Sequence, residues 1–150
     1  MTTLVGHKRA KFDYEILESF EAGISLFGYE VKSVRHGHAK LEGAYVVVRG
    51  GEAYLVGASI APFQSANMPK DYDPERPRTL LLSKKQIAEL LAQSEKRGLT
   101  IIPLSMYNKG RNIKVQVCVV KGKKEYDKRE KIQERDVSRD ILRRLKQQKG

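Results

Sequence analysis

Apolar and polar residues alternate along much of the first 120 positions, a pattern typical of β-strands that bury one face. The first such segment covers residues 12–26. Its alternation is interrupted at residues 21–23, which read Glu-Ala-Gly, and resumes at Ile24. We therefore predict a β-hairpin with a bulge or short turn in this segment, and we place Glu21 at the turn.

Two further hairpins and one short strand are predicted from the same period. Their strands are residues 44–49, 53–56, 100–107 and 113–120, with a separate strand that ends at Ile60. Gly50-Gly51 supplies turn residues for the first pair, and the polar residues 108–112 connect the second pair.

Two segments show helical spacing instead. Residues 28–37 contain two valines three positions apart and end at a glycine suited to a helix cap. Residues 84–97 follow Ser83, which has capping-box spacing to Gln86, and they precede Gly98. We predict a short helix in the first segment and a longer helix over 84–97.

The predicted elements indicate a mainly β fold of the α+β class. Residues 62–78 hold four of the five prolines and predict a long irregular surface loop inserted within the domain. Three hairpins with helices between them favour a small antiparallel β-barrel with about three helices, because closure protects the strand edges. We assign residues 1–120 to this barrel and residues 121–150 to a basic C-terminal tail.

The net charge of the chain indicates which classes of molecule it binds. The 150 residues include 29 Lys and Arg against 18 Asp and Glu, a formal net charge of +11. Phosphate neutralisation releases counterions, so this charge favours a polyanionic partner. Charge alone does not choose between RNA, DNA and an anionic membrane.

The tail is the most basic segment. Residues 121–150 carry twelve Lys and Arg against six Asp and Glu. Such a segment buries too little apolar surface to offset its ordering entropy, so we expect it to be disordered in the free protein. Its later apolar residues nevertheless share one helical face, which predicts folding on binding. These residues are Val137, Ile141, Leu142 and Leu145.

Several classes of protein are disfavoured. Cys118 is the only cysteine, which excludes an internal disulfide and a thiolate zinc cluster and favours the reducing cytoplasm. No segment approaches the roughly 18 apolar residues of a membrane span, and residues 1–9 lack the apolar part of a signal peptide. His36 and His38 have no evident third ligand. We predict no metal site, no cofactor and no enzymatic activity, since no catalytic motif is present.

Three separate motifs carry a resemblance to a known family. They are FEAG at residues 20–23, GYEVKSVR at residues 28–35 and GKKEYDKR at residues 122–129. In this order they closely resemble the SmpB family, the SsrA-binding proteins that partner transfer-messenger RNA (tmRNA) in bacterial ribosome rescue. The resemblance runs from about Lys8 into the tail. It implies an OB-like barrel and a tail that becomes helical on the ribosome.

The resemblance implies a first set of site residues, which contact the tRNA-like domain of tmRNA: Lys8, Arg9, Glu21, Lys32, Arg35 and Leu81. The lysine and arginine on the short helix are spaced to reach one phosphate backbone, and a glutamate can accept hydrogen bonds from base amines or 2′-hydroxyls. Simple solvation of the charged residues, and core packing of Leu81, remain alternatives. Asparagine is common in the family where His7 stands, so the role of His7 stays open.

A second set of site residues lies in the tail, where the family contacts the decoding centre and the downstream messenger channel of the small subunit. It comprises Gly122, Lys123, Lys124, Tyr126, Asp127, Lys128 and Arg129. Cations bind phosphates, and the Tyr126 ring can stack on an unpaired base, as can the histidine that the family often has there. The alternative is a solvated charge run.

The function implied by the resemblance is delivery of tmRNA to stalled ribosomes. The tail would occupy the decoding centre and the empty mRNA channel during trans-translation, leading to tagging of the incomplete polypeptide. Elongation factor Tu, with the alanylated RNA, is a further candidate partner. We expect a cytoplasmic location and neither a membrane nor a DNA partner.

Two other functions are weighed against this one. A general single-stranded nucleic-acid-binding protein of the OB type would carry aromatic residues along its groove, but only 7% of residues are aromatic and none is tryptophan. An RNA-processing enzyme would need a metal or a general base, for which the sequence shows no constellation.

Overall fold

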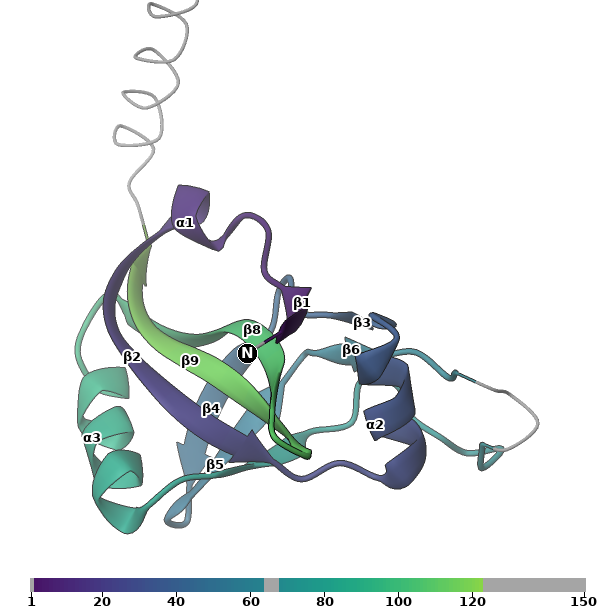
Figure 1. The fold of residues 1–150 in the computed structure, drawn as a ribbon. Helices are drawn as coiled ribbons and strands as arrows, with labels where there is room; N and C mark the ends of the chain where they lie inside the picture. Colours follow the sequence, from purple (N-terminus) through teal and green to yellow (C-terminus); the bar gives the residue numbers. More distant parts are fainter. Residues whose placement is uncertain (1, 64–67, 123–150) are drawn as a thin grey trace, which may run out of the picture.

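The computed structural model of the chain describes residues 2–63 and 68–122. Its main feature is a seven-stranded sheet with the strand order β1-β8-β9-β2-β7-β5-β4, in which every pairing is antiparallel. A separate two-stranded sheet pairs β3 with β6. Figure 1 shows the long curved strands β2, β8 and β9, with α3 on one side and α2 on the other.

The strands are β1 (Thr2–Gly6), β2 (Tyr14–Ile24), β3 (Ala39–Lys40), β4 (Tyr45–Arg49), β5 (Glu52–Val56), β6 (Ser59–Ile60), β7 (Arg78–Leu81), β8 (Leu99–Lys109) and β9 (Asn112–Gly122). The helices are α1 (Ala10–Asp13), α2 (Gly28–Arg35) and α3 (Lys84–Ser94). The predicted mainly antiparallel, OB-like fold with about three helices is confirmed.

The sheet is OB-like without being a closed barrel. In the part of the chain that the structure describes, β1 pairs only with β8, and β4 pairs only with β5, so the two ends of the strand order are not hydrogen-bonded to each other. Both edge strands have five residues, and the register of β1 shifts between Thr3 and Val5. Short and irregular edges limit unwanted strand pairing without closure.

The first predicted hairpin is wrong, because β2 is one continuous strand. Its register shifts between Ile16 and Glu18, where a bulge occurs, and the strand then runs without a turn past Glu21. Ala22 and Gly23, which we interpreted as part of a turn, lie instead in the part of β2 that begins to pair with β7. Gly23 pairs with Leu81, and a Cβ atom on Gly23 would lie 3.1 Å from Leu81 Cβ.

The other two hairpins are confirmed. The turn between β4 and β5 is formed by Gly50 and Gly51, whose φ angles of 58° and 77° suit glycine. The pairing of Lys109 with Asn112 shortens the predicted connection between β8 and β9 to a two-residue turn, Gly110-Arg111. The predicted strand that ends at Ile60 is β6.

Both predicted helices are present. α3 begins after Ser83, whose hydroxyl accepts a hydrogen bond from the Gln86 N–H at 3.1 Å, but it ends at Ser94, three residues before the predicted end. The Lys96 N–H bonds to the Gln93 carbonyl in a tighter turn that closes the helix. The single turn α1 was not predicted, because Phe12 fits the strand alternation that precedes β2.

The predicted surface loop over residues 62–78 is wrong at its end. Arg78 is the first residue of β7 and is fully buried against Glu30 of α2. The Tyr72 hydroxyl donates a hydrogen bond to the Ile60 carbonyl at 2.8 Å. This part of the segment is therefore packed onto α2 and β6, because a buried carboxylate requires partners that polar loop composition does not reveal.

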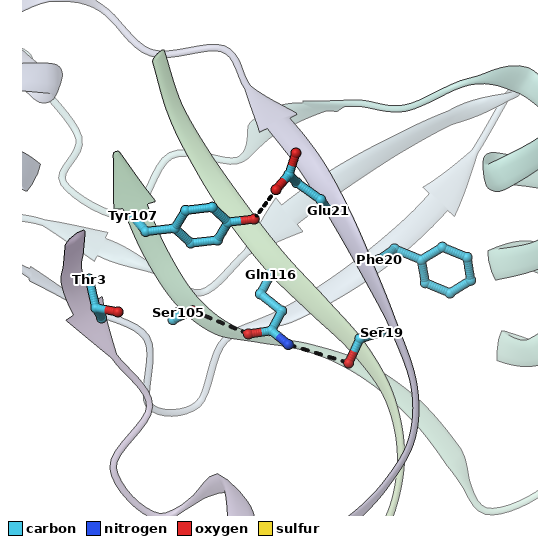
Figure 2. Close-up of a pocket in the computed structure, with 7 residues that line it drawn as sticks. All are labelled: Thr3, Ser19, Phe20, Glu21, Ser105, Tyr107 and Gln116. Carbon is cyan, nitrogen blue, oxygen red and sulfur yellow. Dashed lines mark hydrogen bonds between the residues drawn. The ribbon is translucent and has the colours of Figure 1, made fainter. Parts of the chain in front are cut away.

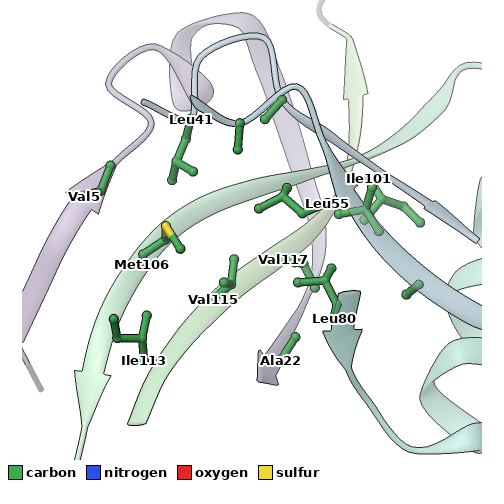
Figure 3. Packing of buried hydrophobic residues seen from close by; sticks show 14 of the residues in the cluster. Val5, Ala22, Leu41, Leu55, Leu80, Ile101, Met106, Ile113, Val115 and Val117 are labelled. Carbon is green, nitrogen blue, oxygen red and sulfur yellow. The ribbon is translucent and has the colours of Figure 1, made fainter. Parts of the chain in front are cut away.

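The core lies on the concave side of the sheet (Figure 3). Its buried side chains include Val5, Leu41, Leu55, Leu80, Ile101, Met106, Val115 and Val117. A second, smaller cluster packs beneath α1 and comprises Ala10, Ile102, Cys118 and Val120. Near α1 the sheet is thus covered on both faces. Farther along β8, β9 and β2, the outer face remains available for contacts.

No helix among the described residues is long and apolar enough to cross a membrane.

Candidate nucleic-acid interface

One row of residues crosses the outer face of the sheet over five strands. In the order β1, β8, β9, β2 and β7, the register aligns Thr3, Tyr107, Lys114, Gly23 and Leu81. Directly paired residues share one face, so these side chains lie opposite the core. The next row contains Ser105, Gln116 and Glu21. Glu21 and Leu81 are thereby brought close together, although they are 60 positions apart.

Glu21 is held in place by two donors. The Tyr107 hydroxyl donates to Glu21 Oε2 at 2.6 Å, as Figure 2 shows, and Lys109 Nζ donates to Oε1 at 2.8 Å. The hydrogen bond from Lys109, followed by that from Tyr107, holds the pKa of Glu21 below its ordinary value. Burial, with the nearby carboxylate, raises the pKa of Tyr107 to about 12. Glu21 is therefore an ionised, oriented acceptor on the sheet face.

A polar groove lies beside Glu21. Its volume is about 440 Å³, and its lining residues are Thr3, Ser19, Phe20, Glu21, Ser105, Tyr107 and Gln116. The Gln116 amide lies between two serines of this groove. Its Oε1 accepts a hydrogen bond from the Ser105 hydroxyl at 3.5 Å, and its Nε2 donates one to the Ser19 hydroxyl at 3.4 Å. Phe20 points away from Glu21 (Figure 2). The groove offers donors and acceptors of the kind that recognise base edges and 2′-hydroxyls.

A second groove lies on the other side of Gly23, and we call it the Leu81 groove. Its volume is about 270 Å³, and it is lined by Gly23, Ile24, Leu26, Val31, Leu81, Arg111, Asn112, Ile113 and Lys114. The Leu81 side chain is 59% exposed. Core packing therefore does not explain why a leucine stands at this position.

One of the two predicted cations of α2, Arg35, contacts the turn between β8 and β9. Lys32 and Arg35 are both exposed. Arg35 Nη2 donates to the Arg111 carbonyl at 2.9 Å, a contact between residues 76 positions apart. A guanidinium has five donors, so this bond leaves Arg35 able to contact a phosphate as well.

Lys8 and Arg9 lie in a different place from Glu21 and Leu81. Lys8 lines a groove of about 570 Å³ together with Lys40 and Glu42. Arg9 lies over the Phe12 ring, at 4.9 Å from its centroid, and its Nη2 is 3.8 Å from Asp13. The predicted contacts therefore form two groups. One comprises Glu21 and Leu81 on the outer sheet face with Lys32 and Arg35 of α2, and the other comprises Lys8 and Arg9 next to α1.

The tail residues are mostly outside the described part of the chain. Gly122 is described: it is the exposed last residue of β9 and pairs with Tyr14. The other candidates, Lys123, Lys124, Tyr126, Asp127, Lys128 and Arg129, lie outside the described residues.

The sequence predictions did not single out the hairpin formed by β8 and β9. Tyr107, Lys109, Arg111 and Lys114 all surround the two grooves. Residues 108–112 were interpreted only as a connection. The sequence feature that could have identified this hairpin is the group of basic residues Lys109, Arg111 and Lys114, which lie at the turn and just after it.

The histidine pair contacts an aromatic ring. His36 stacks on Phe63 with ring centroids 4.2 Å apart, and His38 lies 5.7 Å from the same ring. Within the described ranges, no cluster of three or more His, Cys, Asp or Glu side chains is placed to hold a metal ion.

Comparisons with known proteins identify the family. The sequence model of the SmpB protein family matches residues 4–147. The SsrA-binding protein of Microcystis aeruginosa is 45% identical over 143 residues, which cover 95% of this chain and 93% of that protein. The SsrA-binding protein of Coprothermobacter proteolyticus is 47% identical over 144 residues, which cover 95% and 96%.

A solved structure supports the same assignment. It is a chain from work on tmRNA-SmpB in the bacterial ribosome, with a TM-score of 0.70 and 41% identity over 83% of this chain and 87% of that chain. These matches confirm the resemblance of the three sequence motifs, and the chain belongs to the SmpB family.

Proposed function

We propose that this protein binds the tRNA-like domain of tmRNA and delivers the RNA to stalled ribosomes in trans-translation. Similarity to SsrA-binding proteins over nearly the whole chain supports the proposal. The structural observation that carries it is the outer sheet face, where the oriented carboxylate of Glu21 and the exposed Leu81 lie close together beside basic residues.

The residues of this face contact different chemical groups of the RNA. Glu21 accepts hydrogen bonds from base amines or 2′-hydroxyls, while Leu81 offers an apolar surface to an unstacked base. Lys32 and Arg35 contact the phosphate backbone from α2. Lys8, at the separate groove, and Arg9, next to α1, contact another part of the same folded RNA. Recognition thus depends on shape and backbone charge more than on base sequence.

The second set of proposed contacts begins at Gly122 and lies in the tail. We propose that the seven tail candidates occupy the decoding centre and the empty mRNA channel, and that elongation factor Tu joins the complex with the alanylated RNA. We also propose that the protein acts in the cytoplasm, by binding and without catalysis.

The first experiment is a binding titration against the tRNA-like domain of tmRNA. An unstructured RNA of equal length serves as competitor at two salt concentrations. We expect a preference for the folded RNA that survives the higher salt. Glu21→Ala should weaken binding, whereas the matched control Glu89→Ala, at an exposed position on α3, should not. Equal affinity for both RNAs, lost together as salt rises, would contradict the proposal and favour a general nucleic-acid-binding protein.

The tail is tested by truncation after Gly122. This position keeps the pairs of Lys121 with Glu15 and of Gly122 with Tyr14, which complete β9. We expect the truncated protein to bind the tRNA-like domain nearly as well as the full chain and to lose peptide tagging on stalled ribosomes. Equal loss of both activities would show that the two parts do not act separately.

A further inference from the structure

α2 is too short to be held in place by its own hydrogen bonds. It has eight residues, Gly28–Arg35, and isolated helices of fewer than about 12 residues are only marginally stable in water. Phe27 precedes the helix, and its ring cannot accept the hydrogen bonds that a serine or an aspartate accepts at this position. The position of α2, and with it that of the exposed Lys32 and Arg35, therefore depends on what packs against the helix.

One segment contacts both ends of α2, and we call it the strap. It comprises residues 61–63 and 68–77, the described parts of the chain between β6 and β7. Figure 1 shows both parts beside α2. Side chains of the strap contact the first turn of the helix and the residue that follows its last turn.

At the first turn of α2, the strap contributes Tyr72 and Arg76. The Tyr72 ring packs edge-on against the Tyr29 ring, with centroids 5.3 Å apart, and its hydroxyl lies 3.1 Å from Glu30 Oε2. Arg76 Nε donates to the same oxygen at 3.2 Å, and its guanidinium lies over the Phe27 ring at 4.1 Å from the centroid. The strap thus binds the start of the helix through ring packing and through a shared carboxylate.

After the last turn of α2, the strap contributes Phe63. Its ring stacks on the His36 ring with centroids 4.2 Å and planes 23° apart, and the His38 ring lies 5.7 Å from it. His36 directly follows the helix, and its Nδ1 donates to the Lys32 carbonyl at 2.8 Å. Phe63 therefore packs on the side chain that closes the helix.

The strap lies outside the grooves of the outer sheet face. None of its residues is among the lining residues of the polar groove or of the Leu81 groove. It nevertheless determines where α2 presents its two cations. Contacts between a cation and a phosphate oxygen are about 2.7–2.9 Å long, so a shift of the helix by about 1 Å takes them beyond hydrogen-bond distance.

We propose that Tyr72 and Phe63 are positioning residues for RNA binding. They hold α2 where Lys32 and Arg35 reach the phosphate backbone, and they do not touch the RNA themselves. This inference rests on the proposed function and deepens it, because it assigns a role in RNA affinity to a segment outside the proposed contacts.

The first test is Tyr72→Phe, which keeps the ring against Tyr29 and removes the hydroxyl beside Glu30. Binding to the tRNA-like domain of tmRNA is measured from low to high salt, well below the thermal midpoint of unfolding. We expect about a threefold to tenfold loss of affinity and a smaller salt slope of log K, because phosphate contacts are lost. Tyr54→Phe, which removes a hydrogen bond to Glu52 away from α2, should stay within about twofold of the wild type.

Phe63→Leu tests the other end of the strap. The substitution keeps an apolar side chain at a partly exposed position and removes the ring that stacks on His36. We expect the same two changes, a loss of affinity and a smaller salt slope, in the same assay.

A second background distinguishes positioning from plain stabilisation of the fold. In a protein that carries Lys32→Gln and Arg35→Gln, the cations that the strap positions are absent. Tyr72→Phe and Phe63→Leu should then each weaken binding by less than about twofold. A substitution that only weakens the fold leaves the salt slope unchanged and costs the same factor in both backgrounds.

Failure of the positioning role and failure of the proposed function give different results. Strap variants with wild-type affinity, or with equal losses in both backgrounds, would overturn the positioning role alone when the wild type prefers the folded RNA. A wild type without preference for the folded RNA over the unstructured competitor would overturn the proposed function, and with it this inference.

Discussion

Glu30 and Arg78 form an ion pair in which neither side chain is exposed to solvent. Arg78 Nη2 and Nε donate to Glu30 Oε2 at 2.6 and 3.1 Å, and Arg76 binds the same carboxylate from the segment before β7. The pair joins α2 to the first residue of β7. α2 carries the proposed RNA contact Arg35, and β7 carries Leu81. The buried ion pair therefore fixes the position of α2 relative to β7, and with it the position of Arg35 relative to Leu81.

Removing one partner of this pair should strongly destabilise the fold. Arg78→Met leaves the Glu30 carboxylate buried without its main partner, and we expect the free energy of unfolding to fall by about 3–5 kcal/mol. Arg76→Met is the control, because the Arg76 side chain is 26% exposed and a smaller loss is expected. Urea denaturation measures both values. Equal losses would mean that burial of the pair does not determine its contribution.

Stability should depend on pH through Glu30. Burial by itself raises the pKa of Glu30, but hydrogen bonds from Arg76, the Phe27 N–H and Arg78 outweigh it, so the folded pKa lies below the ordinary value of 4.5. The stabilisation is therefore complete above about pH 4.5 and is lost as the pH falls through the folded pKa.

Glu30→Gln isolates this dependence from that of other carboxylates. The difference in unfolding free energy between the wild type and Glu30→Gln should be constant near neutral pH and should shrink in acid, below about pH 4.5. Urea denaturation series at several pH values measure this difference. A difference that stays constant into acid would show that the charge of Glu30 does not stabilise the folded protein.

Tyr107 should support RNA binding through Glu21. Tyr107→Phe removes one of the two donors to the carboxylate, so the pKa of Glu21 should rise toward its ordinary value and RNA affinity should fall roughly two- to tenfold. An NMR pH titration and a binding assay measure these effects. Tyr54→Phe is the control, since Tyr54 donates to Glu52 outside both grooves. Unchanged affinity with a shifted Glu21 pKa would limit Tyr107 to a structural role.

Gly23→Ala should impair RNA binding more than stability. The added Cβ lies 3.1 Å from Leu81 Cβ, so β2 and β7 must separate by a few tenths of an ångström and Leu81 must move. We expect an affinity loss of about fivefold or more for the tRNA-like domain, with a thermal midpoint that falls by only a few degrees. Gly28→Ala, with no atom within 4 Å of the added Cβ, should change neither. Wild-type affinity for Gly23→Ala would show that the position of Leu81 is unimportant.

The strand period and the turn residues predicted much of the architecture. The hairpin at Gly50-Gly51, the helix after Ser83 and the strands β8 and β9 follow from local patterns, because alternation, capping and positive φ angles act between near neighbours. The same kind of pattern gave a wrong prediction at Gly23, where we expected a turn and the structure has a continuous strand. A glycine that makes room for another strand has the same local signal as a glycine in a turn.

The candidate site was only partly predictable for the same reason. The sequence by itself determined the basic character of the chain and, through three motifs, the family and the candidates Glu21, Arg35 and Leu81. Tertiary structure alone decided that Glu21 binds Tyr107 and Lys109, that Leu81 is exposed above Gly23, and that Glu30 is buried with Arg78. These relationships join residues tens of positions apart. Their energies depend on burial and on strand register, which no local spacing specifies.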